Sequence, residues 1–149
     1  MKKSNVRGFV LMEALFAIFL IAAGALIVAA TMPVSNVSRN TAQLADKAMD
    51  VCQKQMEAIR LGGFSDANPT QLATQGLIDN ANPVGNNLYT FTNSDSTNLD
   101  NPGEVLPSGT GTVEIEQLTF DETRITITVN WMDNGTAKSY SIGTIISNL

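Results

Sequence analysis

The feature that most constrains this chain is an apolar run from Phe9 to Met32, which contains one charged residue, Glu13, among 24 residues. At about 1.5 Å per helical residue, a run of this length spans roughly 36 Å, enough to cross a hydrocarbon core of about 30 Å. The preceding residues, MKKSNVRG, carry three basic side chains and no acid. Because basic flanks stay in the cytoplasm, the sequence predicts one membrane-spanning helix with everything after residue 33 outside.

Glu13 bears on three interpretations of this run. A cleaved secretory signal has a shorter apolar region, about 7–15 residues, followed by a small-residue cleavage site. A plain signal anchor explains the length but gives Glu13 no role, although an acid at the centre of a membrane helix costs about 2.5–3.5 kcal/mol. A cut between Gly8 and Phe9 frees an amino terminus four residues before Glu13, about 6 Å away, as a partner for the carboxylate. Such a pair, formed within one chain or between neighbouring chains, sets axial register more than it adds affinity, because desolvation offsets much of the attraction.

The sequence GFVLMEALFAIFLIAAGALIVAA closely resembles the start of prepilins, the precursors of type IV pilins and of type II secretion pseudopilins. Their shared pattern is a short basic leader ending in Gly, then Phe, then Glu at the fifth mature position of an apolar helix. The resemblance implies that residues 1–8 are a leader, removed after Gly8, and that a membrane prepilin peptidase also N-methylates Phe9. It further implies that residues 9–32 form the filament core and that Glu13 contacts the amino terminus of a neighbouring subunit during assembly.

An amphipathic continuation of the helix is expected over residues 33–61. Pro33 predicts a kink or local break, and Gly24 is a second weak point. Gly62 and Gly63 predict the end of the helix. Apolar side chains recur at helical steps on one face, which we expect to pack beneath a head: Val37, Leu44, Ala48, Val51, Met56 and Ile59.

Cys52 is the single cysteine of the chain, and we expect it to be a small buried residue of this helix. An intermolecular disulfide or a reactive thiol is the alternative. One cysteine cannot form the C-terminal disulfide-bounded loop common in major type IV pilins. Its absence favours the minor pilin and pseudopilin branch.

Residues 62–149 predict a globular β head. Their first part is rich in turn-forming residues, with a short helix capped by Asn68-Pro69 and running through Leu77 and Ile78. A strand over residues 88–93 and an irregular loop over about 94–111 are expected next. A strand over residues 113–120 follows, with a shift in alternation near Gln117 that indicates a bulge.

The last third of the chain predicts a β-hairpin. In RITITVNW, residues 124–131, apolar and polar side chains alternate, and Asn134-Gly135 is a favoured two-residue turn. Counting outward from this turn places Asp133 opposite Thr136, Val129 opposite Tyr140 and Ile127 opposite Ile142. The predicted fold is therefore α+β: a long N-terminal helix packed on an antiparallel meander of three or four strands, as in the pilin fold.

The composition excludes several kinds of site. Without His, the chain has no Ser-His-Asp triad and no imidazole metal ligand. We expect no enzymatic activity, because the side-chain chemistry that the resemblance implies is confined to processing and subunit docking. From Leu61 onward there are ten acids and two bases, which argues against direct binding of nucleic acid. Asp121-Glu122 is interpreted as a polar turn. We expect no cofactor, and four loop residues are only weak candidates for calcium ligands, with a spacing unlike an EF-hand: Asp95, Asn98, Asp100 and Glu104.

The sequence thus predicts a minor pilin or pseudopilin that acts in filament priming, tip formation or assembly of a type IV pilus or type II secretion pseudopilus. Its expected partners are other pilins or pseudopilins through the N-terminal helix, the prepilin peptidase, the inner-membrane assembly platform and the lipid bilayer. Its expected location is the bacterial inner membrane, with the head outside the cytoplasm, and then the filament. The alternative is a single-pass, membrane-anchored β domain that binds a ligand as a monomer.

Overall fold

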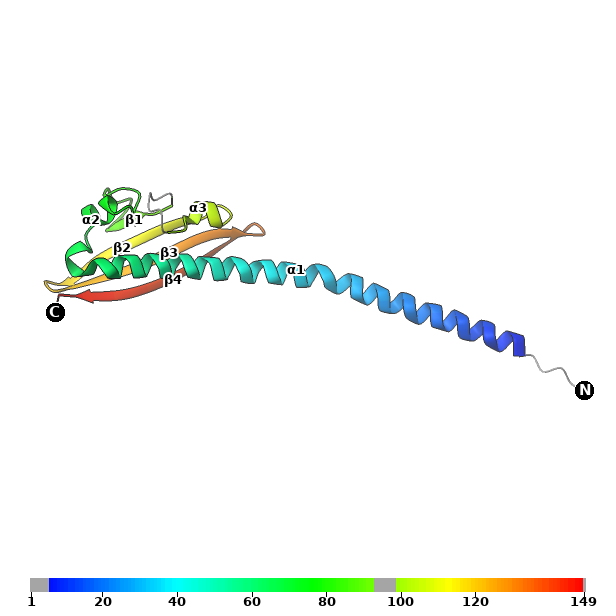
Figure 1. Cartoon of the computed structure of the whole chain (residues 1–149). Helices are drawn as coiled ribbons and strands as arrows, with labels where there is room; N and C mark the ends of the chain where they lie inside the picture. Colours follow the sequence, from blue (N-terminus) through cyan, green and yellow to red (C-terminus); the bar gives the residue numbers. More distant parts are fainter. Residues whose placement is uncertain (1–5, 93–98, 149) are drawn as a thin grey trace, which may run out of the picture. The chain divides into compact units, whose positions relative to one another are not determined.

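A computed structural model describes residues 6–92 and 99–148, apart from the side chains of residues 6–10 and 31–35. The chain is α+β, with its elements in the order α1, α2, β1, α3, β2, β3, β4 (Figure 1). It divides into two compact units, Met1–Asn40 and Thr41–Leu149, which are described in turn.

The first unit contains the start of α1, a helix assigned over Val6–Asp66. Its segment Leu11–Ala30 is long and apolar enough to cross a membrane, and none of it is buried. Large apolar side chains, among them Leu15, Phe16 and Phe19, stand exposed around the helix. Val37 is also exposed, at 52%, so its predicted place on the buried face is wrong. The apolar periodicity of α1 therefore begins before the part of the helix that contributes to the core.

The backbone remains helical through Gly24 and Pro33, so neither residue interrupts α1. The local break considered at Pro33 is therefore not observed, whereas a kink at Gly24 or Pro33 stays a prediction. The interruption in the described helix lies instead at Gly63, whose φ of 71° and ψ of −170° are not helical. The predicted end of the long helix at Gly62-Gly63 is thus confirmed, and a short turn follows as far as Asp66.

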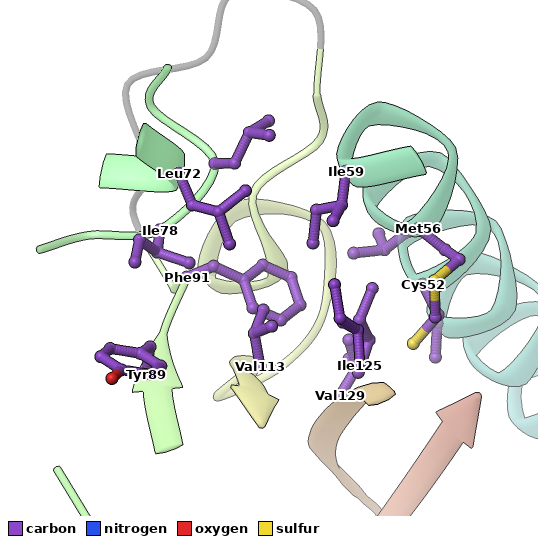
Figure 2. Close-up of a cluster of buried hydrophobic side chains, with 14 of the residues drawn as sticks. Cys52, Met56, Ile59, Leu72, Ile78, Tyr89, Phe91, Val113, Ile125 and Val129 are labelled. Atoms are coloured by element: carbon purple, nitrogen blue, oxygen red, sulfur yellow. The ribbon is translucent and has the colours of Figure 1, made fainter. Parts of the chain in front are cut away.

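The second unit is a head in which α1 lies along one face of a four-stranded sheet (Figure 1). The helix contributes buried side chains at helical spacing: Leu44, Ala48, Val51, Cys52, Met56 and Ile59. Figure 2 shows Ile59 and Met56 reaching toward Phe91, with Val113 and Ile125 of the sheet below. Gln55 is the buried polar residue of this face, and its side-chain amide donates a hydrogen bond to the carbonyl of Leu77.

The sheet is an antiparallel meander of β1 (Leu88–Thr90), β2 (Thr110–Thr119), β3 (Glu122–Asp133) and β4 (Thr136–Ser147), in that order. The predicted hairpin register is confirmed at all three positions: Asp133 with Thr136, Val129 with Tyr140 and Ile127 with Ile142. The bulge expected near Gln117 is also present, as a register shift between Gln117 and Thr119. The inward side chains of β3 are buried, as their alternation predicts: Ile125, Ile127, Val129 and Trp131.

The segment between α1 and β2 is more ordered than expected. Helix α2 (Pro69–Thr74) begins as predicted, because the Asn68 side chain accepts a hydrogen bond from the Gln71 amide. It ends at Thr74, before the predicted end at Leu77 and Ile78, and β1 is shorter than the strand predicted over residues 88–93. The irregular loop predicted over 94–111 is wrong at its end: Pro102–Val105 forms the short helix α3, and β2 begins at Thr110. Pro102 suits the first turn of a helix, and Gly111 lets β2 pass close to the Phe91 ring.

The outer face of the sheet, opposite α1, is lined mainly by small polar side chains. One row of hydroxyl groups crosses all four strands through paired residues: Thr90, Thr112, Thr128 and Ser141. The Thr128 and Ser141 hydroxyls lie 2.8 Å apart, and the Ser141 hydroxyl also donates to the Ile127 carbonyl. Apolar side chains on β3 therefore face the core, while hydroxyls cover much of the other side.

Candidate functional site

The predicted processing bond joins Gly8 and Phe9 near the start of α1. Both residues have helical backbone, and their side chains lie outside the described part of the structure. Leader residues 1–5 also lie outside the described residues. Phe9 is followed four residues later by Glu13, one helical turn along α1, so an amine at Phe9 would lie about 6 Å along the helix axis from that residue.

Glu13 is exposed on α1, at the start of the apolar segment. A shallow groove beside it is bordered by apolar side chains of the same helix, Met12, Phe16, Ala17 and Leu20. Among the described residues, no cation or hydrogen-bond donor pairs with its carboxylate. An unpaired carboxylate is costly in an apolar medium, so in a membrane or helix bundle Glu13 needs a partner from outside the described chain.

The four candidate calcium ligands are not brought together within the described residues. Asp95 and Asn98 lie outside them. Asp100 pairs with Lys54 of α1, whose Nζ lies 2.8 Å from Asp100 Oδ2, and Glu104 is exposed on α3. Over residues 6–92 and 99–148, no three His, Cys, Asp or Glu side chains are grouped closely enough to hold a metal ion.

Of the four candidate calcium ligands, Asp100 contacts a cation of the protein itself, Lys54. Its ammonium lies 2.8 Å from Asp100 Oδ2 and 2.8 Å from Asp50 Oδ2. The hydrogen bonds to Asp100, and then to Asp50, raise the pKa of Lys54. The pair with Asp50 follows from helical i, i+4 spacing, whereas nothing local in the sequence indicates the pair with Asp100.

Cys52 is fully buried in the head, as predicted. Its Sγ lies 3.9 Å from the carbonyl oxygen of Tyr140, a weak contact with β4. Burial raises the pKa of the Cys52 thiol to about 11, which keeps it protonated near neutral pH. A buried, protonated thiol is a poor nucleophile and cannot reach another subunit while the head stays folded.

Asp121 lies in the turn between β2 and β3, as predicted, whereas Glu122 is the first residue of β3. Thr119 pairs with Glu122, so Phe120 and Asp121 form the connection between β2 and β3. The Asp121 carbonyl accepts a hydrogen bond from the Asn148 amide, and both acids are exposed. Their surroundings are those of a surface turn.

The head also contains a pocket of about 460 Å³ beyond the end of the long helix, which the sequence does not predict. Its lining comes from α1, α2, β1, β2 and β3 and from the residues between them, so no short motif marks it. No protein-family model, curated protein or solved structure matches the chain. Its function must therefore be inferred from the exposed apolar segment, from Glu13 and from the head itself.

Proposed function

We propose that this chain is a subunit of a type IV pilin-like filament, of the minor pilin or pseudopilin branch, with a pilin fold. One observation supports the proposal most strongly. An exposed carboxylate, Glu13, stands in a helix whose 20-residue apolar segment, Leu11–Ala30, contains no buried residue. Such a segment needs an apolar environment, and Glu13 needs a positive partner within it.

Cleavage after Gly8 provides the positive partner that Glu13 needs. The freed amine of Phe9 is a cation that stays at the same end of the apolar segment as Glu13. Between neighbouring subunits, the amine and the carboxylate pair and fix how far one helix lies along the next. Bundled apolar segments bury one another in the filament core, as lipid covered them in the inner membrane, and the heads face outward.

The role that follows is mechanical. The precursor is inserted in the inner membrane as a single-pass protein and is processed there by the prepilin peptidase. The assembly platform then moves the mature subunit into a filament. There it primes, caps or modifies a type IV pilus or a type II secretion pseudopilus. The side-chain chemistry is limited to processing at Gly8-Phe9 and docking at Glu13, without an enzymatic step.

The first experiment determines the N-terminus. The chain is expressed in cells with an active prepilin peptidase and in matched cells that lack it, and the purified protein is analysed by mass spectrometry. We expect loss of residues 1–8 and one added methyl group on Phe9 only where the peptidase is active. An intact leader, or a cut near residues 30–33, contradicts the proposal. An intact leader favours the membrane-anchored monomer that binds a ligand.

The second experiment tests Glu13. Glu13→Gln keeps the size of the side chain and removes its charge, and Glu57→Gln, at an exposed acid of α1 in the head, is the matched control. We expect the Glu13 variant to remain in the membrane fraction but to be lost from sheared filaments, while the Glu57 variant enters filaments like the wild type. If both variants enter equally, the docking role of Glu13 is wrong.

A further inference from the structure

The pocket in the head forms because the long helix ends before the sheet does. Ile59 is the last buried residue of α1 before Gly63 turns the chain away. Beyond that point the inner face of the sheet continues through Ile115 and Gln117 of β2 and Thr123 of β3, which line the pocket. Figure 1 shows the β2–β3 connection extending past the end of the helix. The pocket is thus a part of the sheet's inner face that the long helix leaves uncovered.

The walls of the pocket combine aromatic surface with neutral polar groups. Two aromatic residues belong to the lining: Phe64, just after the turn at Gly63, which is half-buried, and Tyr89 of β1, which is only 7% exposed. Asn68 contributes an amide that is already held in place, because it accepts from the Gln71 amide and donates to the Ser65 carbonyl. The volume of the pocket, about 460 Å³, falls in the range of about 300–1,000 Å³ that small-molecule sites occupy.

Several polar groups in the lining are open to a ligand. Thr123 is 7% exposed, and its hydroxyl makes no hydrogen bond with another described residue. Among the described residues no buried side-chain oxygen or nitrogen lacks a partner, so this hydroxyl is in contact with solvent. Asn87 and Gln117 are exposed, and their side-chain amides, without a partner among the described residues, are free to exchange water for a ligand. Hydroxyls and amides both donate and accept, so together they match a ligand whose own groups do both.

The charge of the pocket narrows the ligand class. None of its ten lining residues is charged, so it offers no cation for a phosphate or carboxylate and no carboxylate for an amine. The acidic balance of the surrounding head, ten acids against two bases from Leu61 onward, disfavours anions further. The ligand that fits is therefore neutral, hydroxylated, and apolar on one face.

We propose that this pocket binds one or two residues of a neutral carbohydrate. A sugar ring presents an apolar face to Phe64, the more exposed of the two aromatic residues, and hydroxyls to Gln117 and Thr123. An extended peptide is a poorer match, because peptides add to the open backbone of a strand edge. The floor of this pocket is the side-chain face of two paired strands. The proposal does not depend on filament assembly, because it concerns only the pocket of the head.

The test uses the full chain, labelled with ¹⁵N, in micelles of a detergent that contains no sugar. Glucose, galactose, mannose and their N-acetylated amino sugars are titrated as neutral probes, and glucuronic acid and N-acetylneuraminic acid as anionic ones. We expect at least one neutral sugar to shift the amide signals of Gln117 and Thr123 saturably. Absence of such shifts with every neutral sugar, or tighter binding of the acids, overturns the proposal.

Two variants locate the binding. Thr123→Val keeps the shape of the side chain and removes its hydroxyl, and Gln117→Leu removes the amide. Each is expected to weaken binding by about fivefold, the worth of one hydrogen bond. Thr126→Val is the matched control, since Thr126 lies on the same strand but faces outward, paired with Gly143. Unchanged binding in both test variants, or an equal loss in Thr126→Val, shows that the sugar binds elsewhere and overturns the assignment.

Discussion

Lys54 Nζ lies 2.8 Å from Asp100 Oδ2, an ion pair that joins α1 to a residue 46 positions later in the chain. The same ammonium reaches Asp50 Oδ2 one turn earlier on the helix. Two carboxylates that would otherwise repel each other are thereby held around one positive charge. Since all three side chains are about half exposed, the arrangement orients the segment before α3 more than it stabilises the head.

This ion pair predicts how the head responds to calcium. A ligand that binds the folded state raises its melting temperature, and Asp100 is already neutralised by Lys54. We expect neither added Ca²⁺ nor EDTA to change the melting temperature of the full chain, followed by circular dichroism. If Ca²⁺ raises the melting temperature and EDTA reverses the rise, this expectation is wrong and the four candidate ligands again become a possible calcium site.

The centre of β3 should dominate the stability of the head. Ile127→Ala removes a fully buried side chain and should lower the free energy of unfolding by about 2–5 kcal/mol. Ile145→Ala makes the same substitution at a side chain that is 54% exposed and should cost less than about 1 kcal/mol. Urea unfolding of both variants measures the difference. Equal losses mean that the inner and outer faces of the sheet are wrongly assigned.

Gly111 should not tolerate a larger residue. A Cβ atom there would lie 2.5 Å from Cζ of Phe91, so Gly111→Ala should lower the free energy of unfolding by about 1–3 kcal/mol. At Gly143 the nearest atom to an added Cβ is the Ile125 carbonyl oxygen, 3.6 Å away, which is an ordinary contact. Gly143→Ala should therefore change stability by less than about 0.5 kcal/mol. Denaturant curves compare the two, and a neutral Gly111→Ala shows that the Phe91 ring moves freely.

Cys52 should be unreactive until the head unfolds. Its single thiol allows alkylation by iodoacetamide to be read directly as a mass increase, and we expect none at neutral pH without denaturant. Rapid labelling of the native chain would show that this part of the core opens to solvent.

The same thiol predicts a dependence of stability on pH. The folded state holds the proton up to a pKa of about 11, whereas the unfolded thiol loses it above 9.0. Between these values the unfolded state binds fewer protons, so stability falls as pH rises from 9 to 11. Cys52→Ala lacks this contribution, and its stability should fall less steeply over that interval. Parallel slopes would show that the folded thiol titrates normally.

The head should fold without the apolar segment. The core begins at Leu44, and the second compact unit begins at Thr41. A chain that starts at residue 34 should therefore give the same far-ultraviolet circular dichroism per head and a melting temperature close to that of the full chain in micelles. Aggregation or non-cooperative melting of this shorter chain would mean that the head depends on the removed segment.

The parts of the fold that sequence predicts well are those fixed by neighbouring residues. The hairpin register follows from Asn134-Gly135 and the alternation on either side, since a two-residue turn leaves one pairing that keeps apolar side chains on one face. The start of α2 at Asn68-Pro69 is equally local. Glu13 stands out because a single acid in an apolar run conflicts with its surroundings.

Features that depend on contacts between residues distant in the chain could not be predicted from local sequence patterns. Val37 continues the apolar periodicity of α1, but periodicity does not show where the sheet begins to cover the helix. Residues 102–105 and 110–112 looked irregular because their order comes from contacts with β1, Phe91 and neighbouring strands. The pocket was missed for the same reason, since Phe64, Tyr89 and Thr123 meet only once the sheet has formed.

The position of β4 at the border of the sheet has a consequence for handling the protein. Along its 12 residues, alternate backbone amides and carbonyls point away from β3, and Lys138 is the one charged side chain of the strand. Apart from the Tyr140 carbonyl near Cys52, no described residue beyond β3 is bonded to this border. Repulsion between acidic heads opposes the pairing of one β4 edge with another. Because salt screens that repulsion, we expect heads to associate through β4 sooner in concentrated salt than at low salt.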